Sequence, residues 1–135
     1  MSNITQVVKQ EKYMTTLNRG VTASGLGQVL SGTGPFTLFA PSDLAFGKLG
    51  VGTIANLLKA ENKLILANLI NHHVVAGKIE FKDLKDGEKL KTINGKELSV
   101  HIKDGKVSVN GATIQQHDVK TSNGVIHSLD AVLKK

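Results

Sequence analysis

The chain lacks cysteine and tryptophan, and few of its 135 residues are aromatic. Without cysteine, disulfides and thiolate metal sites are excluded. The aromatic residues are four phenylalanines and Tyr13, so the core must be built mainly from leucine, isoleucine and valine. A chain of this length buries enough surface on folding for one stable core without covalent staples. We therefore expect a single domain over residues 1–135.

Arginine is also scarce, since Arg19 is the one arginine among 17 basic residues. Specific recognition of bases and phosphates relies on the planar guanidinium fork, so we expect no nucleic-acid partner. The formal net charge is +6, but lysines and acids interleave in the most charged stretch, residues 78–106. Interleaved signs are typical of solvated strands and protected sheet edges, and they do not make a basic stripe.

Long apolar segments are missing too. No apolar run approaches the roughly 20 residues that a membrane-spanning helix needs, so we expect no integral membrane segment. Residues 1–5 show neither the basic nor the apolar region of a signal peptide. The chain is then either cytosolic or the mature part of an exported protein, and the sequence leaves both alternatives open.

Apolar residues recur at helical spacing through most of the first half of the chain. A short buried strand is expected at residues 36–40, followed by a helix capped by Ser42 or Asp43. The strongest helical period spans residues 54–73, either as one bent helix or as two helices that break near residues 60–62.

The apolar period changes from helical to alternating after Gly77. Leu98, Val100 and Ile102 alternate with polar residues, which is typical of a half-buried strand. Tight-turn dipeptides separate such segments, at 94–95, 104–105, 110–111 and 123–124. Helices followed by consecutive hairpins predict an α+β fold.

Three segments resemble the signature motifs of the fasciclin (FAS1) domain family. Residues 37–46 (TLFAPSDLAF) resemble its first box, residues 71–77 (NHHVVAG) its middle motif, and residues 123–130 (NGVIHSLD) its second box. The motifs occur in the family's order and span nearly the whole chain. The structural motif positions that this resemblance selects are Phe39, Pro41, Phe46, Asn123, Gly124, His127 and Asp130.

The resemblance implies a wedge of two small, mainly antiparallel β-sheets with several short helices packed on one side. It also implies a secreted or cell-surface module for cell adhesion or extracellular matrix contact, which binds a surface protein or polysaccharide. Such a module works without cofactor or catalysis. We expect a monomer similar to the single-domain bacterial members of the family.

The resemblance points to two candidate binding positions. His72 and His73 lie in the middle motif, where the family usually has tyrosine before histidine. Asp118 and Val119 stand where several members carry an Asp-Ile pair implicated in receptor contact. An exposed aspartate beside an aliphatic residue offers a charge and an apolar anchor. The alternative is that Val119 is simply an inward strand residue.

The histidines offer the one conceivable ligand set for a metal, and they are His72, His73, His101, His117 and His127. Zinc sites need ligands on converging faces, such as histidines four residues apart on a helix. The present spacing does not provide this, so we expect no metal.

Two of the histidines have a structural interpretation. His73 falls in helical phase with Leu66 and Ile70, which predicts a core histidine with one ring nitrogen hydrogen-bonded. His127 alternates with apolar neighbours in its strand, so we expect an inward ring that bonds buried backbone near the turn at 123–124.

Catalytic patterns are missing from the sequence. It contains no G-x-S-x-G elbow and no cysteine nucleophile, and its glycine-rich stretches lack the lysine of a phosphate loop. We expect no enzyme and no cofactor. The alternative to an adhesion module is a charge-driven binder of polyanions or anionic membrane surfaces. At the turn before the last strand, we expect Gly124 to adopt a positive φ.

Overall fold

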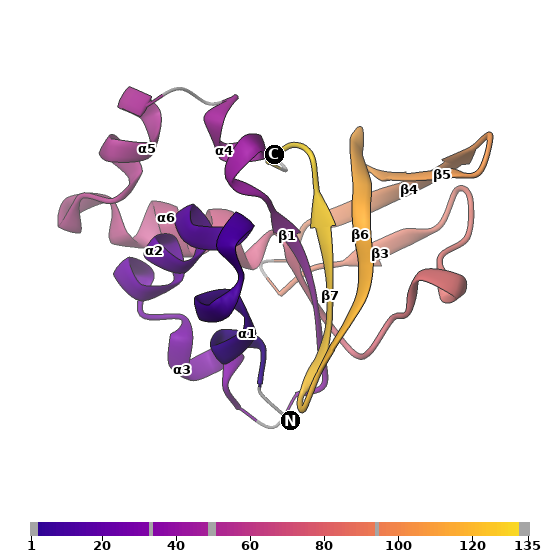
Figure 1. Cartoon of the computed structure of the whole chain (residues 1–135), viewed down its shortest axis with the longest axis horizontal. Coiled ribbons are helices and arrows are strands. Elements are labelled where there is room, and N and C mark those ends of the chain that lie inside the picture. The colour runs from indigo at the N-terminus through magenta and orange to yellow at the C-terminus, as the bar shows by residue number, and fades with distance from the viewer. Residues whose placement is uncertain (1–2, 33, 49–50, 94, 133–135) are drawn as a thin grey trace.

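The computed structural model describes residues 3–32, 34–48, 51–93 and 95–132. The helices gather on one side of the molecule and the strands on the other (Figure 1). The α-helices are α1 (Ile4–Gln10), α2 (Thr15–Ser24), α3 (Gly27–Leu30), α4 (Asp43–Gly47), α5 (Val51–Leu57) and α6 (Lys63–Asn71). Short 3-10 helices are η1 (Lys12–Met14), η2 (Ala60–Asn62) and η3 (Phe81–Asp83). The strands are β1 (Phe36–Pro41), β2 (Val74–Ala76), β3 (Lys89–Lys91), β4 (Glu97–Lys103), β5 (Lys106–Val109), β6 (Ala112–Thr121) and β7 (Gly124–Leu129). The predicted α+β class is confirmed.

The strands form a 7-stranded sheet in the order β2-β1-β7-β6-β5-β4-β3. β1 and β7 are parallel, and the other neighbouring pairs are antiparallel. The first residues of β6 pair with β5 and the later ones with β7, so this long strand belongs to two arms of the sheet. Figure 1 shows β4 and β5 running across the direction of β6. The two small sheets expected from the sequence are therefore two arms of one continuous sheet.

Two hydrophobic cores lie on the two faces of the arm that contains β1 and β7. Leu38 and Ile126 pack with the helices, whereas Phe39 and Leu129 pack with the second arm of the sheet. The division follows from strand geometry, because successive side chains point to opposite faces. β1 and β7 are buried on both faces, which explains why their sequences are almost continuously apolar.

The helical region agrees with the predicted boundaries. Ser42 caps α4, since its Oγ accepts a hydrogen bond of 3.2 Å from the backbone N–H of Ala45. The strong helical period at residues 54–73 divides into α5 and α6, with η2 between them. The break thus falls at residues 60–62, as one of the two alternatives predicted.

Asp43 connects α4 to the start of α2. Its carboxylate accepts hydrogen bonds of 2.6 Å from the Thr15 hydroxyl and 2.7 Å from the Thr16 N–H. Partial burial raises the pKa of Asp43, but the bonds from these threonines outweigh it and hold the pKa below its ordinary value. Asp43 therefore satisfies a free N–H in the first turn of α2, which has no side-chain cap of its own.

Two tight turns have the geometry that their dipeptides predict. Asp104 and Gly105 both have positive φ, at 54° and 78°, and connect β4 to β5. Asn110 and Gly111, at 49° and 86°, connect β5 to β6 in the same way. Of the dipeptide at 94–95, Asn94 lies outside the described residues.

The prediction for Gly124 is wrong. Gly124 is the first residue of β7, pairs with Thr121, and is not among the glycines with positive φ. The hairpin turn is therefore formed by Ser122 and Asn123, one position earlier than expected. A Cβ at Gly124 would collide with the carbonyl oxygen of Phe36 and lie 2.8 Å from its carbonyl carbon. Close approach of β1, and not backbone conformation, requires glycine at this position.

Candidate functional site

The candidate site begins with an irregularity in β6. Between Gln116 and Val119, β6 contains one residue more than the facing stretch of β7, because these two residues pair with Ser128 and Ile126. Asp118 adopts a left-handed conformation there, with φ of 57°. A β-bulge of this kind redirects side chains from the regular alternation. Here it brings Asp118 into contact with the η3 segment.

The Asp118 carboxylate is held on two sides. One oxygen accepts a hydrogen bond of 2.9 Å from the backbone N–H of Phe81, and the other lies 3.1 Å from Nδ1 of His117. Burial raises the pKa of Asp118, but these bonds and the neighbouring imidazoles together hold the pKa below its ordinary value. Asp118 thus remains ionised near neutral pH while its side chain is 31% exposed.

His127 lies beneath this carboxylate and is fully buried. Its Nδ1 accepts a hydrogen bond of 3.1 Å from the backbone N–H of Asp118, so Nε2 carries the proton and donates to the Ile79 carbonyl at 2.8 Å. Burial lowers the pKa of His127, although the Ile79 bond and the Asp118 charge oppose the change. The predicted inward orientation is confirmed. The predicted location of its partners is wrong, because they are Asp118 and Ile79 and not the turn at 123–124.

The outer surface of the site is a pair of stacked rings. The ring centroids of Phe81 and His117 are 3.9 Å apart with an interplanar angle of 17°. The His117 side chain is 47% exposed, and Phe81 packs at the edge of the sheet-side core. Phe81 is not among the site residues expected from the sequence, because no local pattern pairs it with His117. The one signal was a rare aromatic residue in a strongly charged stretch.

Val119 faces away from this ring pair. It is half-buried and packs against the core on the helix side of the sheet, as the inward-residue alternative predicted. Asp118 and Val119 therefore lie next to each other in sequence but do not form one exposed surface.

His72 and His73 are both 2% exposed at the junction of α6 and β2. Nδ1 of His73 lies 2.7 Å from the Leu69 carbonyl, in agreement with the predicted core histidine. Burial is the main reason that the pKa of His73 falls to about 4. Both ring nitrogens of the buried His72 have no hydrogen-bond partner among the described residues. A binding role for these rings stays a prediction, and a partner docked on the folded surface would not touch them.

Asn123 occupies the point where four segments meet. Its side-chain oxygen accepts a hydrogen bond of 2.9 Å from the N–H of Ile4, and its amide donates to the carbonyls of Leu30 and Gly32. Its own carbonyl accepts from the N–H of Phe36 at 2.9 Å. Asn123 is buried, so each of these bonds fixes the fold and leaves no group for a partner.

The remaining motif residues have structural environments as well. Phe39 and Phe46 are buried in the sheet-side and helix-side cores, and Pro41 ends β1. Asp130 accepts a hydrogen bond of 2.8 Å from the N–H of Thr113, just beyond β7. The motifs that carry the resemblance therefore hold the strands and helices together.

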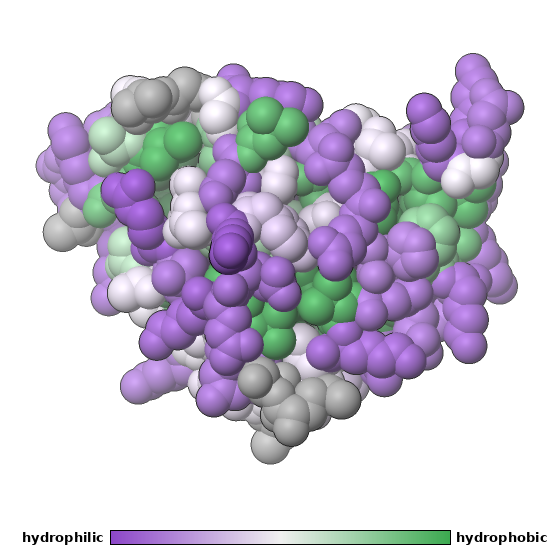
Figure 2. Space-filling view, in the orientation of Figure 1, coloured by the Kyte–Doolittle hydropathy of each residue, from purple (hydrophilic) through white to green (hydrophobic). Residues whose placement is uncertain are grey.

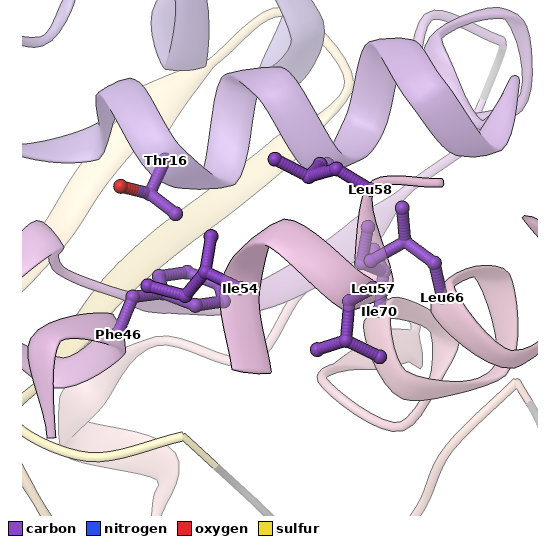
Figure 3. Close-up of a pocket in the computed structure, with 8 residues that line it drawn as sticks. Thr16, Phe46, Ile54, Leu57, Leu58, Leu66 and Ile70 are labelled. Atoms are coloured by element: carbon purple, nitrogen blue, oxygen red, sulfur yellow. The ribbon is translucent and has the colours of Figure 1, made fainter. Parts of the chain in front are cut away.

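The described residues contain no cluster of metal ligands, and the apolar pocket between the helices is small. No group of three or more histidine, aspartate or glutamate side chains in the described ranges could hold a metal ion. A partly open apolar pocket between α2, α4, α5 and α6 has a volume of about 10 Å³, the space of about one water molecule (Figure 3). Its walls include Thr16, Phe46, Ile54, Leu57, Leu58, Leu66 and Ile70. A pocket of this volume has no room for a ligand larger than a water molecule.

The described α-helices contain between 4 and 10 residues. None of them has both the length and the apolar character needed to span a bilayer.

Comparisons with known proteins agree on one family. Residues 12–135 match the model of the fasciclin domain. Protein sll1483 of Synechocystis sp. is 43% identical over 130 residues, covering 96% of this chain and 72% of that protein. Protein sll1735 of the same organism is 38% identical over 133 residues, covering 98% of this chain and 98% of that protein. The transforming growth factor-beta-induced protein ig-h3 of Sus scrofa is 35% identical over 133 residues, covering 98% of this chain but 19% of that protein.

The fold has a counterpart among solved structures. A FAS1 domain pair from the insect cell adhesion molecule Fasciclin I superposes with a TM-score of 0.88 at 19% identity. The match covers 99% of this chain and 51% of the pair. Fasciclin domains occur in adhesion and extracellular proteins. The motif order, the sheet topology and these matches together assign the chain to the fasciclin domain family.

Proposed function

We propose that this domain is a non-catalytic adhesion module that binds a cell-surface or matrix protein or polysaccharide. One observation carries the proposal: apart from the buried His72 ring, the polar side chains at the motif positions are already used in internal hydrogen bonds. His127 holds Asp118 and Ile79, Asn123 joins four segments, and Asp43 caps α2. Chemistry at these groups would require breaking the fold. Function is therefore left to the outer surface.

The partner would contact the β6 bulge, which we define as residues 116–119 of β6. The stacked His117 and Phe81 rings form a flat surface with an ionised Asp118 carboxylate beside it. His127 anchors the backbone beneath this surface, through its hydrogen bonds to Asp118 and Ile79. The surface is therefore already ordered, and little conformational freedom is lost when a partner docks. Aromatic surface next to a fixed charge is a common composition of interface hot spots. Val119 supports this surface indirectly, because its side chain packs β6 against the helix-side core.

By analogy with the adhesion proteins of the family, we propose that the domain acts as a monomer outside the cell or at its surface. Charge-driven binding to a polyanion or an anionic membrane is the second candidate, favoured by the net charge of +6. Salt distinguishes the two, because screening weakens exposed charge pairs steeply and affects a packed contact much less.

An array of matrix proteins and polysaccharides tests the proposal, with the purified domain applied at low and at physiological salt. We expect binding to a subset of surfaces that persists at physiological salt. His117→Ala should weaken that binding by about tenfold, as removal of a central interface ring does. The matched control is His101→Ala, which removes an exposed histidine from β4.

Three results would contradict parts of this proposal. Binding that vanishes at physiological salt would favour the charge-driven candidate. Equal losses in His117→Ala and His101→Ala would remove the contact from the β6 bulge. No binding to any surface would leave the adhesion function without support.

A further inference from the structure

A groove lined by basic residues runs along α2 on the helical side of the molecule. It consists of two adjoining hollows that share Thr22. One hollow, of about 570 Å³, lies between α1, α2 and α3 and contains Lys9, Gln28 and Lys63. The other, of about 340 Å³, contains Asn18 and Arg19. Both hollows are shallow and open to solvent, so they suit a ligand that lies along the surface.

The charged side chains that line the groove are all positive. Lys9, Arg19 and Lys63 are exposed, and no aspartate or glutamate lines either hollow. In the described part of the chain, no ion pair engages any of these three cations. Asp43, an acid of the same helical side, is already bonded to Thr15 and Thr16. The three charges are therefore available to an anion from outside.

The three cations come from elements that only the fold brings together. Lys9 is in the last turn of α1, Arg19 is in α2, and Lys63 begins α6. The ammonium of Lys63 lies 3.7 Å from the point that a Cβ on Gly25 would occupy, beside the C-terminal end of α2. The negative end of the helix dipole favours a cation there, which holds Lys63 over the groove.

The neutral lining narrows the class of ligand. Asn18, Thr22 and Gln28 supply amides and a hydroxyl, which match the hydroxyl groups of a sugar. The lining also contains apolar side chains, namely Val21, Ala23 and Leu58. No aromatic side chain lines the hollows, so stacking of nucleic-acid bases has no platform here. Spaced positive charges among hydrogen-bonding groups in an elongated hollow suit a chain that carries both carboxylates and hydroxyls.

We propose that this groove binds an acidic polysaccharide, with its carboxylates paired to Lys9, Arg19 and Lys63. The inference rests on the proposed adhesion function and gives it a partner class. It uses a surface separate from the β6 bulge, which lies in the sheet. Figure 2 shows hydrophilic residues interspersed with apolar patches on the helical side in that view.

Oligogalacturonate is the probe for the test, with neutral dextran as the uncharged control polymer. We expect the domain to bind oligogalacturonate and not dextran, as measured by calorimetry at an ionic strength of about 0.15 M. The variant Lys9→Gln, Arg19→Gln, Lys63→Gln should lose at least about tenfold in affinity, because the paired charges are removed. The matched variant Lys89→Gln, Lys91→Gln, Lys103→Gln removes the same formal charge from β3 and β4 and should stay within about threefold of the parent.

Because Lys63 also lies at the end of α2, single variants Lys9→Gln and Arg19→Gln accompany the triple variant, and each should weaken binding. Equal losses in the groove and sheet triples would overturn the proposal, since net charge alone would then attract the polymer. Lack of binding to oligogalacturonate would overturn it too. If His117-dependent binding to another surface persisted, the adhesion function would stand without the groove. If all binding were absent, both proposals would fail.

Discussion

At the scale of single residues, buried polar side chains of this domain connect distant segments through hydrogen bonds. His127 is the clearest case, since both of its ring nitrogens bond backbone groups, one of Asp118 and one of Ile79. The polar groups that it satisfies belong to β6 and to the segment before η3, which are far apart in sequence. A buried group that loses such a partner costs about 1 to 3 kcal/mol.

His127→Phe should therefore destabilise the domain by about 2 to 4 kcal/mol, because the ring volume stays while two backbone groups lose their partner. Urea unfolding measures the change in the free energy of unfolding. His101→Phe is the control, since His101 is exposed and should change stability by less than about 0.5 kcal/mol. A His127→Phe variant as stable as the parent would mean that these two bonds contribute nothing to stability.

At the scale of elements, the parallel pair of β1 and β7 imposes the tightest steric constraint. The register joins Phe36 to Gly124 and continues to the pair of Pro41 and Leu129. At the start of this register the two backbones approach so closely that a side chain on Gly124 has no room. The glycine of the Asn-Gly signal therefore serves strand pairing, although the dipeptide is typical of a turn.

Gly124→Ala should cost at least about 2 kcal/mol, because either β1 or β7 must shift to relieve the overlap with the Phe36 carbonyl. Gly47→Ala is the matched control. Gly47 ends α4 with no atom within 4 Å of a new Cβ and no positive φ, so alanine there should be neutral or stabilising by up to about 1 kcal/mol. Thermal unfolding compares the two. Equal melting temperatures would refute the close approach of the strands.

At the scale of the whole molecule, buried histidines couple the fold to pH. The pKa of His73 falls from 6.5 to about 4 on folding, mainly through burial, and the pKa of His127 is lowered in the same direction. Below pH 6.5 the unfolded chain binds protons at these rings while the folded chain does not. Stability is therefore complete above that pH and declines as the pH falls toward the folded pKa.

Between pH 7 and pH 4 we expect the free energy of unfolding to decrease by about 3 kcal/mol through His73 alone, with a further decrease from His127. Urea unfolding at a series of pH values measures this decline. His73→Gln should flatten the curve, and His101→Gln, at an exposed position, should leave it unchanged. A parent protein with constant stability over this range would contradict the neutral, buried state of His73.

The lowered pKa values of Asp43 and Asp118 act at more acidic pH. Their contributions are present above the ordinary pKa of 3.8 and are lost as the pH falls through the lower folded values. As the pH falls, the buried histidines therefore lose their stabilising contribution first, and the two carboxylates lose theirs at lower pH.

The sequence by itself determined the α+β class, the turn at Asp104 and the family, and it located the bend or break of the 54–73 helical region near residues 60–62 without deciding between them. It did so because helical period, alternation and turn chemistry depend on neighbours along the chain. Only the tertiary structure decided the ring pair of Phe81 and His117, the role of Gly124 and the convergence of cations along α2. These depend on strand register, on a β-bulge and on helix packing, and no local pattern encodes which distant residues such contacts bring together.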